Sequence, residues 1–384
     1  MTEWRECKLK ELADFNPESL TTKNKLQFIN YLDTGNITKG KIDTIQYLNL
    51  STDKVPSRAK RIVKKNDIIY STVRPNQEHY GIIKNPIDNM IVSTGFVVLR
   101  SKEDKCDSNF LYYFLTLPEN TEYLSNVAED STTAYPSITP DVIMNMDIAL
   151  PPLPEQKAIA EVLSSLDDKI DLLTRQNKTL EDLAQAYFRK WFIEDASSEW
   201  EVGKLGDEFN ITMGQSPKGE TYNDLKIGLP FFQGKAEFGF RFPLEKQYCS
   251  EPIKIADKFD TLLSVRAPVG ALNMALYKCC IGRGLAIPIH KKGYKHYTFY
   301  KMKSLQELFN TFDDDGTVFG SISREKFLSI DNVIPPEKLV CYFDNFAKYF
   351  DLKIYENTVQ IRTLSKLRDT LLPKLISGEV RVNI

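Results

Sequence analysis

The feature that most constrains the fold of this chain is a long heptad pattern near its middle. Apolar side chains recur there at alternating intervals of four and three residues, and Asn177 stands at the one interrupted position. The members of this series are Ile159, Leu163, Leu166, Ile170, Leu173, Leu180, Ala184, Tyr187 and Trp191. Such spacing is typical of the a and d positions of a coiled coil. Because Pro154 and Glu155 suit a first helical turn, we predict one long helix over 154–194.

The same pattern returns near the C-terminus in the same register. Phe343 follows Ile159 by 184 positions (343 − 159 = 184), and this offset holds along both series. The second series consists of Phe343, Ala347, Phe350, Ile354, Ile361, Leu364, Leu371 and Leu375. Two helices in one register indicate an internal duplication, with the second helix and its tail over 337–384.

The length of these helices and their polar positions bear on how they pair. About 37 residues at ~1.5 Å per residue give each helix a length of roughly 55 Å. If the helices pair antiparallel within the chain, Asn177 faces Asn357 at core positions. A buried asparagine pair can fix the register of a coiled coil. Both residues can equally be polar groups that are tolerated beside the seam, and the pattern leaves the two interpretations open.

The segments 1–153 and 195–336 form the other half of the repeat, and we call them the first and second heads. Residues 68–73 and 91–100 are rich in β-branched side chains and predict strands. Residues 109–117 predict a short helix. Trp4 aligns with Trp200, and the segment 67–74 resembles 260–266. The predicted fold class is α+β: two mixed α/β heads separated by two long helices that form an intramolecular antiparallel coiled coil, with a pseudo-twofold internal repeat.

Composition bounds the setting in which the chain works. The sequence is 42% hydrophobic and 27% charged, as in ordinary globular proteins. No run approaches the ~18 apolar residues that a membrane-spanning helix needs, and the cysteines show no CxxC spacing. These features predict a cytoplasmic protein with no membrane segment. The net charge is −2, so DNA binding has to be argued from local patches.

The sequence contains few motifs of a catalytic protein. There is no glycine-rich loop for S-adenosylmethionine and no Asn/Asp-Pro-Pro-aromatic motif for base methylation. Asp141, Glu155 and Lys157 satisfy the loose pattern of a metal-dependent nuclease. Glu155 and Lys157 are also explained as charges in the first turn of a helix. We therefore expect no catalytic residue, metal or cofactor in this chain, with any catalysis in other chains.

In the first head, a basic run is the main candidate for contact with nucleic acid. Clusters of Lys and Arg bind phosphates because neutralised phosphates release counterions. A solvated surface is the alternative interpretation. The candidate residues of the first head are Lys54, Arg58, Lys60, Arg61, Lys64 and, beside Pro75, Arg74.

The second head offers Gln, Ser, Lys and Arg on turns that are rich in Gly and Pro. Gln suits adenine, and Arg suits guanine or phosphate. Arg74 and Arg266, which follow strands in the two heads, can instead brace the fold through a carboxylate. The candidate residues of the second head are Gln215, Ser216, Lys218, Gln233, Lys235, Arg241, Arg266 and Arg283.

The whole layout resembles the DNA-specificity subunit of type I restriction–modification systems. The motifs that carry the resemblance are PPLPEQ (151–156), SLDDKI (165–170), DTLLSVRAPVG (260–270), CCIGRGLA (279–286) and PKLISGE (373–379). The resemblance implies that each head is a target-recognition domain that reads one half of a bipartite, asymmetric site in double-stranded DNA. It also implies that the helices set the spacing between the half-sites. Two methyltransferase subunits would dock on the helices with S-adenosylmethionine, and motor–nuclease subunits would bring ATP and Mg²⁺ chemistry.

One departure from the family pattern concerns the start of the second helix. PPEKLV (335–340) lacks the PEQ box of the first helix (154–156), which puts in doubt whether both helices offer the same docking surface. Two other functions remain as alternatives at this level. One is a structural coiled-coil adaptor that binds proteins with both heads, and the other is the metal-dependent nuclease.

Overall fold

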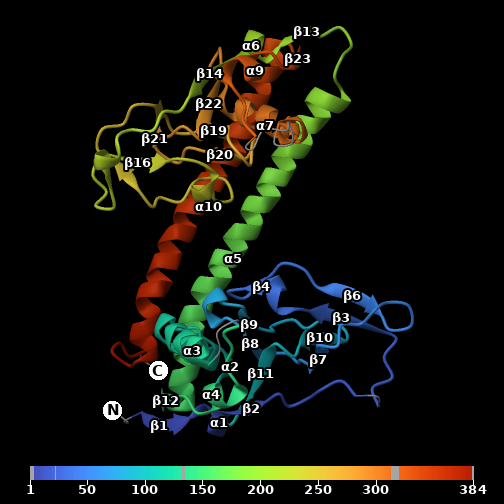
Figure 1. Ribbon diagram of the computed structural model, residues 1–384, viewed down its shortest axis with the longest axis vertical. Helices are drawn as coiled ribbons and strands as arrows, with labels where there is room; N and C mark the ends of the chain where they lie inside the picture. The colour runs from blue at the N-terminus through green and yellow to red at the C-terminus, as the bar shows by residue number, and fades with distance from the viewer. Residues whose placement is uncertain (1–3, 22, 132–134, 313–319, 383–384) are drawn as a thin grey trace. The chain divides into compact units, whose positions relative to one another are not determined.

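The computed structural model describes residues 4–21, 23–131, 135–312 and 320–382 (Figure 1). The chain folds as two compact units. Unit 1 contains residues 1–170 and 363–384, and unit 2 contains residues 171–362. Each unit therefore combines one head with a stretch of both long helices. No helix in the described part of the chain is long and apolar enough to cross a membrane.

Unit 1 is built on two four-stranded sheets with the orders β6-β3-β10-β7 and β2-β11-β8-β9. β10 runs parallel to β3, and the other pairs in these sheets are antiparallel. The strands are β1 (Arg5–Lys8), β2 (Ala13–Phe15), β3 (Phe28–Leu32), β4 (Ile37–Thr38), β5 (Lys41–Ile42), β6 (Gln46–Asn49), β7 (Ala59–Ile62), β8 (Ile68–Ser71), β9 (Tyr80–Ile82), β10 (Met90–Ser93), β11 (Phe96–Ser101) and β12 (Asp147–Leu150). The short helices are α1 (Leu9–Leu12), η1 (Thr34–Asn36), η2 (Pro75–Gln77), α2 (Ser108–Leu115), α3 (Pro118–Ser131) and α4 (Pro140–Met144).

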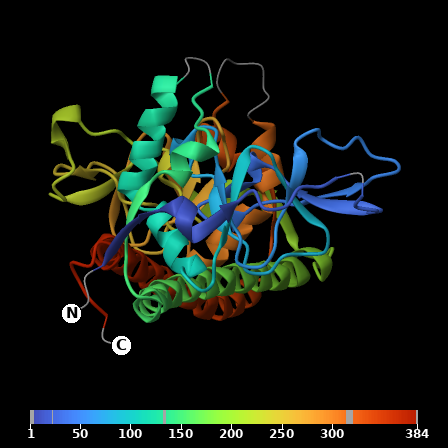
Figure 2. The same ribbon diagram turned by 90° about the horizontal axis from the view of Figure 1, so that it is seen from below.

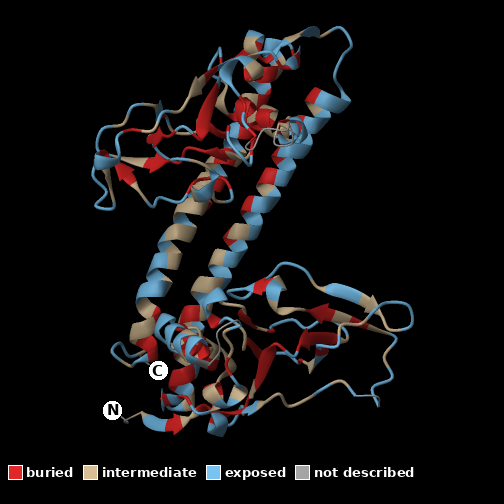
Figure 3. Cartoon of the chain, viewed as in Figure 1, coloured by how far each residue is buried: buried red, intermediate tan, exposed pale blue. Residues whose placement is uncertain are grey.

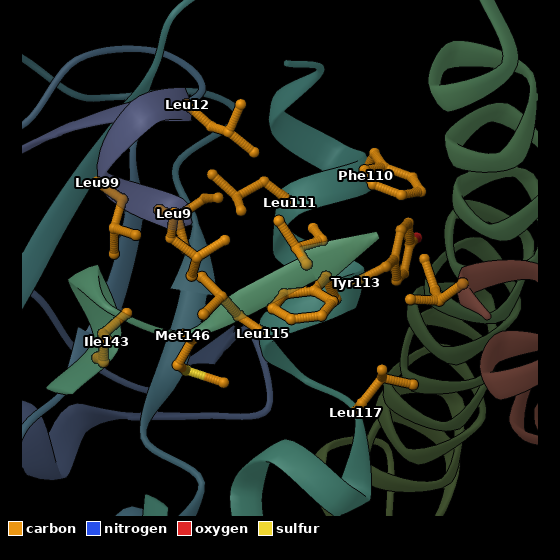
Figure 4. Packing of buried hydrophobic residues seen from close by; sticks show 14 of the residues in the cluster. Leu9, Leu12, Leu99, Phe110, Leu111, Tyr113, Leu115, Leu117, Ile143 and Met146 are labelled. Atoms are coloured by element: carbon orange, nitrogen blue, oxygen red, sulfur yellow. The ribbon is translucent and has the colours of Figure 1, made fainter. Parts of the chain in front are cut away.

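Strand β11 organises the core of the first head because both of its faces are buried. Alternate side chains of a strand point to opposite faces. Val97 and Leu99 join the cluster that includes α1 and α2, whereas Phe96 and Val98 join the cluster between the two sheets. Figure 4 shows the first cluster, with Phe110 and Tyr113 projecting from α2 toward the long helix. The short helix predicted over 109–117 is thus confirmed as α2.

The strand predicted over 91–100 is wrong in one respect, because the chain breaks into β10 and β11 at Thr94 and Gly95. The Gly95 amide donates to Ser93 Oγ (3.3 Å), and the Gly95 carbonyl accepts from the Thr72 amide (2.8 Å). A Cβ at position 95 would lie 2.9 Å from Thr34 Cγ2. The break brings this turn against two other loops, and that contact could not be read from β propensity.

Unit 2 repeats the plan with the sheets β14-β22-β19-β20 and β15-β17-β16-β21-β18. Its strands are β13 (Glu201–Lys204), β14 (Phe209–Met213), β15 (Tyr222–Asn223), β16 (Leu229–Phe232), β17 (Tyr248–Cys249), β18 (Ile255–Ala256), β19 (Thr261–Ser264), β20 (Leu272–Met274), β21 (Cys279–Ile281), β22 (Leu285–His290) and β23 (Asp331–Ile334). Its short helices are α6 (Leu205–Glu208), η4 (Gly219–Thr221), η5 (Lys235–Glu237), α7 (Lys295–Ser304), α8 (Gln306–Thr311) and α9 (Arg324–Leu328).

The long helices are α5 (Leu153–Arg189), which continues into the π-helical turn η3 (Lys190–Glu194), and α10 (Glu337–Ile376). They run antiparallel within each unit. In unit 1 Arg368 pairs with Asp167 (2.7 Å), and in unit 2 the Asn357 amide donates to Asn177 Oδ1 (2.9 Å). Figure 2 shows α5 (green) and α10 (red) side by side. The predicted facing of the two asparagines is confirmed.

The heptad seam of α5 is confirmed over most of its length and shifts near its end. Residues buried as predicted include Ile159, Leu163, Leu173 and Ala184. Figure 3 shows buried residues recurring along one side of α5. Near the C-terminal end Phe188 (2% exposed) is the buried residue, whereas Tyr187 is 39% exposed and packs against the ring of Phe346. A straight helix drifts relative to a strict heptad, and Phe188 turns toward Tyr297 of the second head.

Candidate nucleic-acid interface

Three loops of the second head converge where β14, β16 and β21 end. The Gln215 amide donates to the Ile281 carbonyl (3.2 Å), and the Gly282 amide donates to the Phe232 carbonyl (2.8 Å). The Arg283 amide donates to Ser216 Oγ (3.2 Å). These backbone bonds place Gln215, Ser216, Gln233 and Arg283 on adjoining loops, although these residues lie up to 68 positions apart (283 − 215 = 68).

A fourth segment joins the same place after β19. The Val265 amide donates to the Gly284 carbonyl (2.9 Å), which sets Arg266 beside the loop that carries Arg283. We name Gln215, Ser216, Gln233, Arg266 and Arg283 the second-head loop cluster. The sequence prediction selected all five residues, and the structure brings them together.

Glycine makes this convergence possible at two positions. A Cβ on Gly214 would lie 2.2 Å from the Gly282 carbonyl oxygen, and a Cβ on Gly284 would lie 2.4 Å from the Gln233 carbonyl oxygen. Because each clash would be with backbone, any side chain at these positions would push the loops apart. The loop cluster is therefore fixed by main-chain contacts and by Ser216 Oγ, and these contacts do not engage the side chains of Gln215, Gln233, Arg266 and Arg283.

The cluster presents uncompensated hydrogen-bonding groups to solvent. The side chains of Gln215, Gln233, Arg266 and Arg283 are exposed, and Ser216 is half-buried. Among the described residues, no carboxylate lies within the 4.0 Å ion-pair distance of Arg266 or Arg283. The bracing role considered for Arg266 therefore has no acidic partner in the described structure. Exposed guanidinium and amide groups on rigid loops suit base edges and phosphates.

The two predicted lysines of the second head lie on the same loops. Lys218 is exposed and lies 3.8 Å from Glu220, a loose pair between two well-hydrated side chains. Lys235 begins η5, directly after Gln233 and Gly234, and is also exposed. Both lysines can add positive charge at the margin of the cluster.

In the first head, Arg74 corresponds to Arg266, and Arg58 lies beside the turn that corresponds to the loop of Arg283. The Thr94 amide donates to the Arg58 carbonyl (2.8 Å), and Thr72, two residues before Arg74, donates to Gly95 (2.8 Å). The turn Ser93–Gly95 thus stands where the loop of Arg283 stands in the second head. Both arginines are exposed, and the Arg74 guanidinium lies 5.6 Å from the ring centroid of Tyr135.

The rest of the basic run does not form one patch. Lys64 pairs with Glu18, and together with Arg100 it lowers the pKa of that carboxyl. Arg61 donates to Ser19 Oγ (3.3 Å). Lys54 and Lys60 are exposed and, within the described ranges, have no carboxylate in ion-pair reach. Because adjacent residues of β7 point to opposite faces, Lys60 and Arg61 do not share a surface.

The prediction for Arg241 as a DNA contact is wrong, because its side chain is completely buried. Its guanidinium bonds to Glu181 (3.0 Å) and Asp351 (2.7 Å). Burial would lower the pKa of this group, but Tyr300, Asp351 and Glu181 together raise it, so it stays charged. The sequence had indicated a turn rich in Gly, whereas the arginine is paired with carboxylates of the two long helices.

The nuclease constellation is also not assembled. Glu155 is 3% exposed, and its carboxylate accepts bonds from Arg381 and from Trp4 Nε1. Asp141 lies on α4 and Lys157 is exposed on α5. Within the described ranges, no group of three or more His, Cys, Asp or Glu could hold a metal ion.

The PEQ box has an internal role that the sequence did not reveal. Gln156 is 1% exposed and accepts from the Asp107 amide (2.9 Å) while it donates to the carbonyls of Lys105 and Pro151. Glu155 holds Trp4 and Arg381. The box therefore fastens the first head and the C-terminal segment to α5, and its absence from α10 says nothing about a docking surface.

Sequence reasoning missed a pair of equivalent aspartates on the long helices. Asp167 accepts from Tyr113 of α2 (2.8 Å), and Asp351 accepts from Tyr300 of α7 (3.1 Å). They are separated by the repeat offset (351 − 167 = 184), so the alignment of the two helices could have found them. Their tyrosines come from helices of the two heads that occupy corresponding positions.

Comparison with known proteins places this architecture in a family. The family model described as "Type I restriction modification DNA specificity domain" matches residues 1–182. The chain is 30% identical over 403 residues to a Methanocaldococcus jannaschii protein provisionally named the specificity subunit of the type I restriction enzyme MjaX, with 99% of this chain and 94% of that protein covered. It is 23% identical over 462 residues to the specificity subunit of the HindI enzyme of Haemophilus influenzae, with 99% and 100% covered.

The fold agrees with this relationship. The crystal structure of the type I restriction–modification S subunit from M. genitalium superposes with a TM-score of 0.64 at 19% identity, covering 97% of this chain and 96% of that chain. This superposition shows that the solved structure shares the fold of this chain. The chain belongs to the family of type I restriction–modification DNA-specificity subunits.

Proposed function

We propose that this chain is the DNA sequence-recognition subunit of a type I restriction–modification complex and that the second-head loop cluster reads one half of its target. The first head reads the other half with the surface that carries Arg58 and Arg74. Catalysis is supplied by other chains: methyltransferase subunits with S-adenosylmethionine, and restriction subunits with ATP and Mg²⁺.

The observation that carries this proposal is the convergence of exposed Gln and Arg side chains on loops fixed by main-chain bonds. Sequence is read by hydrogen bonds to base edges, and bidentate Arg–guanine and Gln–adenine contacts are the common forms. Such contacts require side chains that are preorganised and not neutralised by the protein. The loops that carry Arg266 and Arg283 are fixed by main-chain bonds, and neither guanidinium has a carboxylate partner within the described structure.

The long helices support the second part of the proposal, in which they set the distance between half-sites. α5 has 37 residues and α10 has 40. At ~1.5 Å per residue each is longer than one turn of B-DNA, ~34 Å. The difference between the loops of the two heads supports a target whose halves have different sequences.

The test is binding of the purified chain, with its methyltransferase partner, to a randomised library of duplex DNA. We expect selection of one bipartite sequence, with affinity that falls as salt rises. The variant Arg266→Ala/Arg283→Ala should lose selection at one half-site. Lys204→Ala is the matched control, because it removes an exposed charge of the same head on β13, in a different sheet.

The adaptor alternative makes the opposite prediction. An adaptor would bind its partner proteins without selecting any sequence from the library, and the double variant would behave like the control. Either result would contradict the proposed function.

A further inference from the structure

The buried Arg241 forms the centre of a charged cluster that the proposed function does not explain. It lies between η5 and β17 of the second head, and its backbone carbonyl accepts from the Met274 amide of β20 (2.8 Å). Its guanidinium binds Glu181 of α5 through Nε (3.2 Å) and Nη2 (3.0 Å), and Asp351 of α10 through Nη1 (2.7 Å). One side chain of the head is thus bonded to both long helices.

The other members of the cluster complete its hydrogen bonds and charge balance. Tyr300 donates to Asp351 (3.1 Å), and His296 Nδ1 lies 2.7 Å from the second oxygen of Asp351. Lys303 pairs with Glu181, and the Arg241 guanidinium lies 3.9 Å from the ring centroid of Phe299. Two carboxylates therefore face the cations Arg241 and Lys303 in a site from which water is largely excluded.

Unit 1 contains a related arrangement whose arginine comes from a different place. There Tyr113 of the head donates to Asp167 of α5, and Arg368 of α10 pairs with the same carboxylate (2.7 Å). The position on α5 that corresponds to Arg368 is Ala184 (368 − 184 = 184). Ala184 is fully buried. In unit 2, therefore, the helix supplies no arginine, and the head supplies Arg241 instead.

We propose that Arg241 is a positioning residue that holds the second head in one orientation on the two helices, and thereby determines how strictly the protein distinguishes DNA targets with different distances between half-sites. This inference rests on the proposed function of the chain. A head that can tilt on the helices would reach half-sites at several separations. A guanidinium with three bonds to two helices allows only one arrangement.

The substitution Arg241→Met removes the charge and the planar guanidinium group with its several donors, but keeps much of the side-chain volume. It leaves Glu181 and Asp351 with Lys303, His296 and Tyr300 as their partners, so the link that joins both helices to the head through one group is lost. A second variant, Arg241→Met/Ala184→Arg, places an arginine where unit 1 has Arg368. By the repeat it should reach Asp351, but it joins α5 to α10 and gives the head no new bond, so this variant tests whether compensating the charge of Asp351 is enough.

Arg100→Met is the matched control. Arg100 is also a head arginine paired with a buried carboxylate, because it binds both oxygens of Asp67 (2.9 and 2.7 Å). Its bonds stay within the first head, with Asp67 and Glu18. If Arg241→Met does not fold, as judged by circular dichroism and thermal unfolding, Arg241→Lys keeps the charge without the bidentate geometry and takes its place.

The first measurement does not depend on DNA. Nitroxide labels at Glu251→Cys in the second head and Lys348→Cys on α10, both exposed positions, report the distance between head and helix by electron–electron double resonance. Half-buried Cys341 is replaced by Ser in all variants, because the other native cysteines are buried. We expect one narrow distance distribution in the unsubstituted chain and in Arg100→Met. It should broaden in Arg241→Met and stay broad in the double variant, whose new arginine does not bond the head.

The second measurement uses the chain with its methyltransferase partner and its selected DNA target. We compare binding to this target with binding to the same half-sites moved one base pair closer or farther apart. Arg241→Met should reduce this discrimination by roughly tenfold without changing the preferred bases, and the double variant should not restore it.

Three outcomes would overturn the inference: a narrow distance distribution in Arg241→Met, discrimination that is unchanged when the distribution broadens, or a double variant that restores both properties without a bond from the head. If the unsubstituted chain selects no DNA sequence, the proposed function fails, and the link to spacing fails with it. The distance distributions would still decide whether Arg241 holds the head.

Discussion

At the scale of single residues, exposure separates side chains that can meet DNA from those that hold the protein together. Arg241 and Arg283 both follow closely on glycines, and this shared local feature does not distinguish them. Arg283 lies on an exposed turn, whereas Arg241 is buried between two carboxylates. Burial of a guanidinium requires partners that compensate its charge, and these come from residues 60 and 110 positions away.

For Arg283 the expected effect is specific to sequence. Arg283→Ala should weaken binding to the selected target by about 1–3 kcal/mol and relax the preference at one base pair of one half-site. Lys235→Ala should weaken binding to all sequences about equally and lower the dependence on salt, because a phosphate contact carries no base information. Titration against the target and single-base variants at two salt concentrations distinguishes these effects. A uniform loss for Arg283→Ala would make it a phosphate contact.

A pH dependence of stability follows from Glu208, which lies on α6 and is buried within the second head. Burial would raise the pKa of this carboxyl, but the close approach of His290 Nε2 (3.6 Å from Oε1), the charge of Lys301 and the bond from Asn332 (2.8 Å) together lower it. A lowered folded-state pKa stabilises the protein above the unfolded value, near 4.3, and this contribution is lost as pH falls through the folded-state value.

Glu208→Gln should therefore reduce the free energy of unfolding by about 1–3 kcal/mol at neutral pH. The difference from the unsubstituted protein should shrink as pH falls below about 4. Urea unfolding of both proteins from pH 7 to pH 3 measures it. A difference that stays constant over this range would show that the charge of Glu208 is not involved.

At the scale of elements, the long helices combine an apolar seam with polar groups. In unit 2 the seam contains Asn177 and Asn357, both less than 4% exposed and bonded to each other. Nearby lie Glu181 and Asp351, which bind Arg241. Apolar residues alone allow neighbouring registers of similar energy, whereas a buried polar pair is satisfied in one register. The proposed role of the asparagines in register is consistent with their mutual bond.

The two long helices can be lengthened by whole heptads without disturbing their apolar seam. One heptad inserted after Ile170 and one inserted after Arg362 keep the seam in register at the boundary between the units. Seven residues add ~10.5 Å, or about three base pairs at ~3.4 Å each. We expect the selected half-sites to keep their sequences while their separation grows by about that amount. Selection from a randomised duplex library checks this, and an unchanged separation would contradict a spacer role.

At the scale of the whole molecule, the long helices and the main sheets correspond between the two halves of the repeat, whereas the ligand-facing loops differ. The helix offset of 184 relates Asp167 to Asp351, and tyrosines of corresponding head helices bind both. The loops that carry Arg283 and Gln233 have counterparts in the turn Ser93–Gly95 and in η1, with different side chains. Two heads with corresponding sheets but different loops are expected to read different DNA sequences.

The two halves of the target should therefore differ. Mapping methylated positions in the genome of the host, with and without an intact copy of this chain, should show modification that depends on the chain at sites with two unlike half-sequences. A palindromic site would mean that the two heads read the same bases despite their different loops.

Much of the fold can be predicted from local sequence. The heptad spacing predicted both long helices and the facing of Asn177 and Asn357, because helical periodicity depends on neighbours along the chain. The motifs shared with a known family predicted the heads and the class of function. The exposed Gln and Arg residues of the loop cluster were also found from their turn context.

Only the tertiary structure decided which charged groups are available. In the tertiary structure Arg241 is buried, and Glu155 is bonded to Arg381 and Trp4. Contacts between backbone segments bring Gln215, Gln233 and Arg283 to one place. The physical reason is that the energy of a charge depends on its distance from water and from opposite charges. Those distances are set by segments far apart in the chain, whereas the periodicity of a helix is set within a few residues.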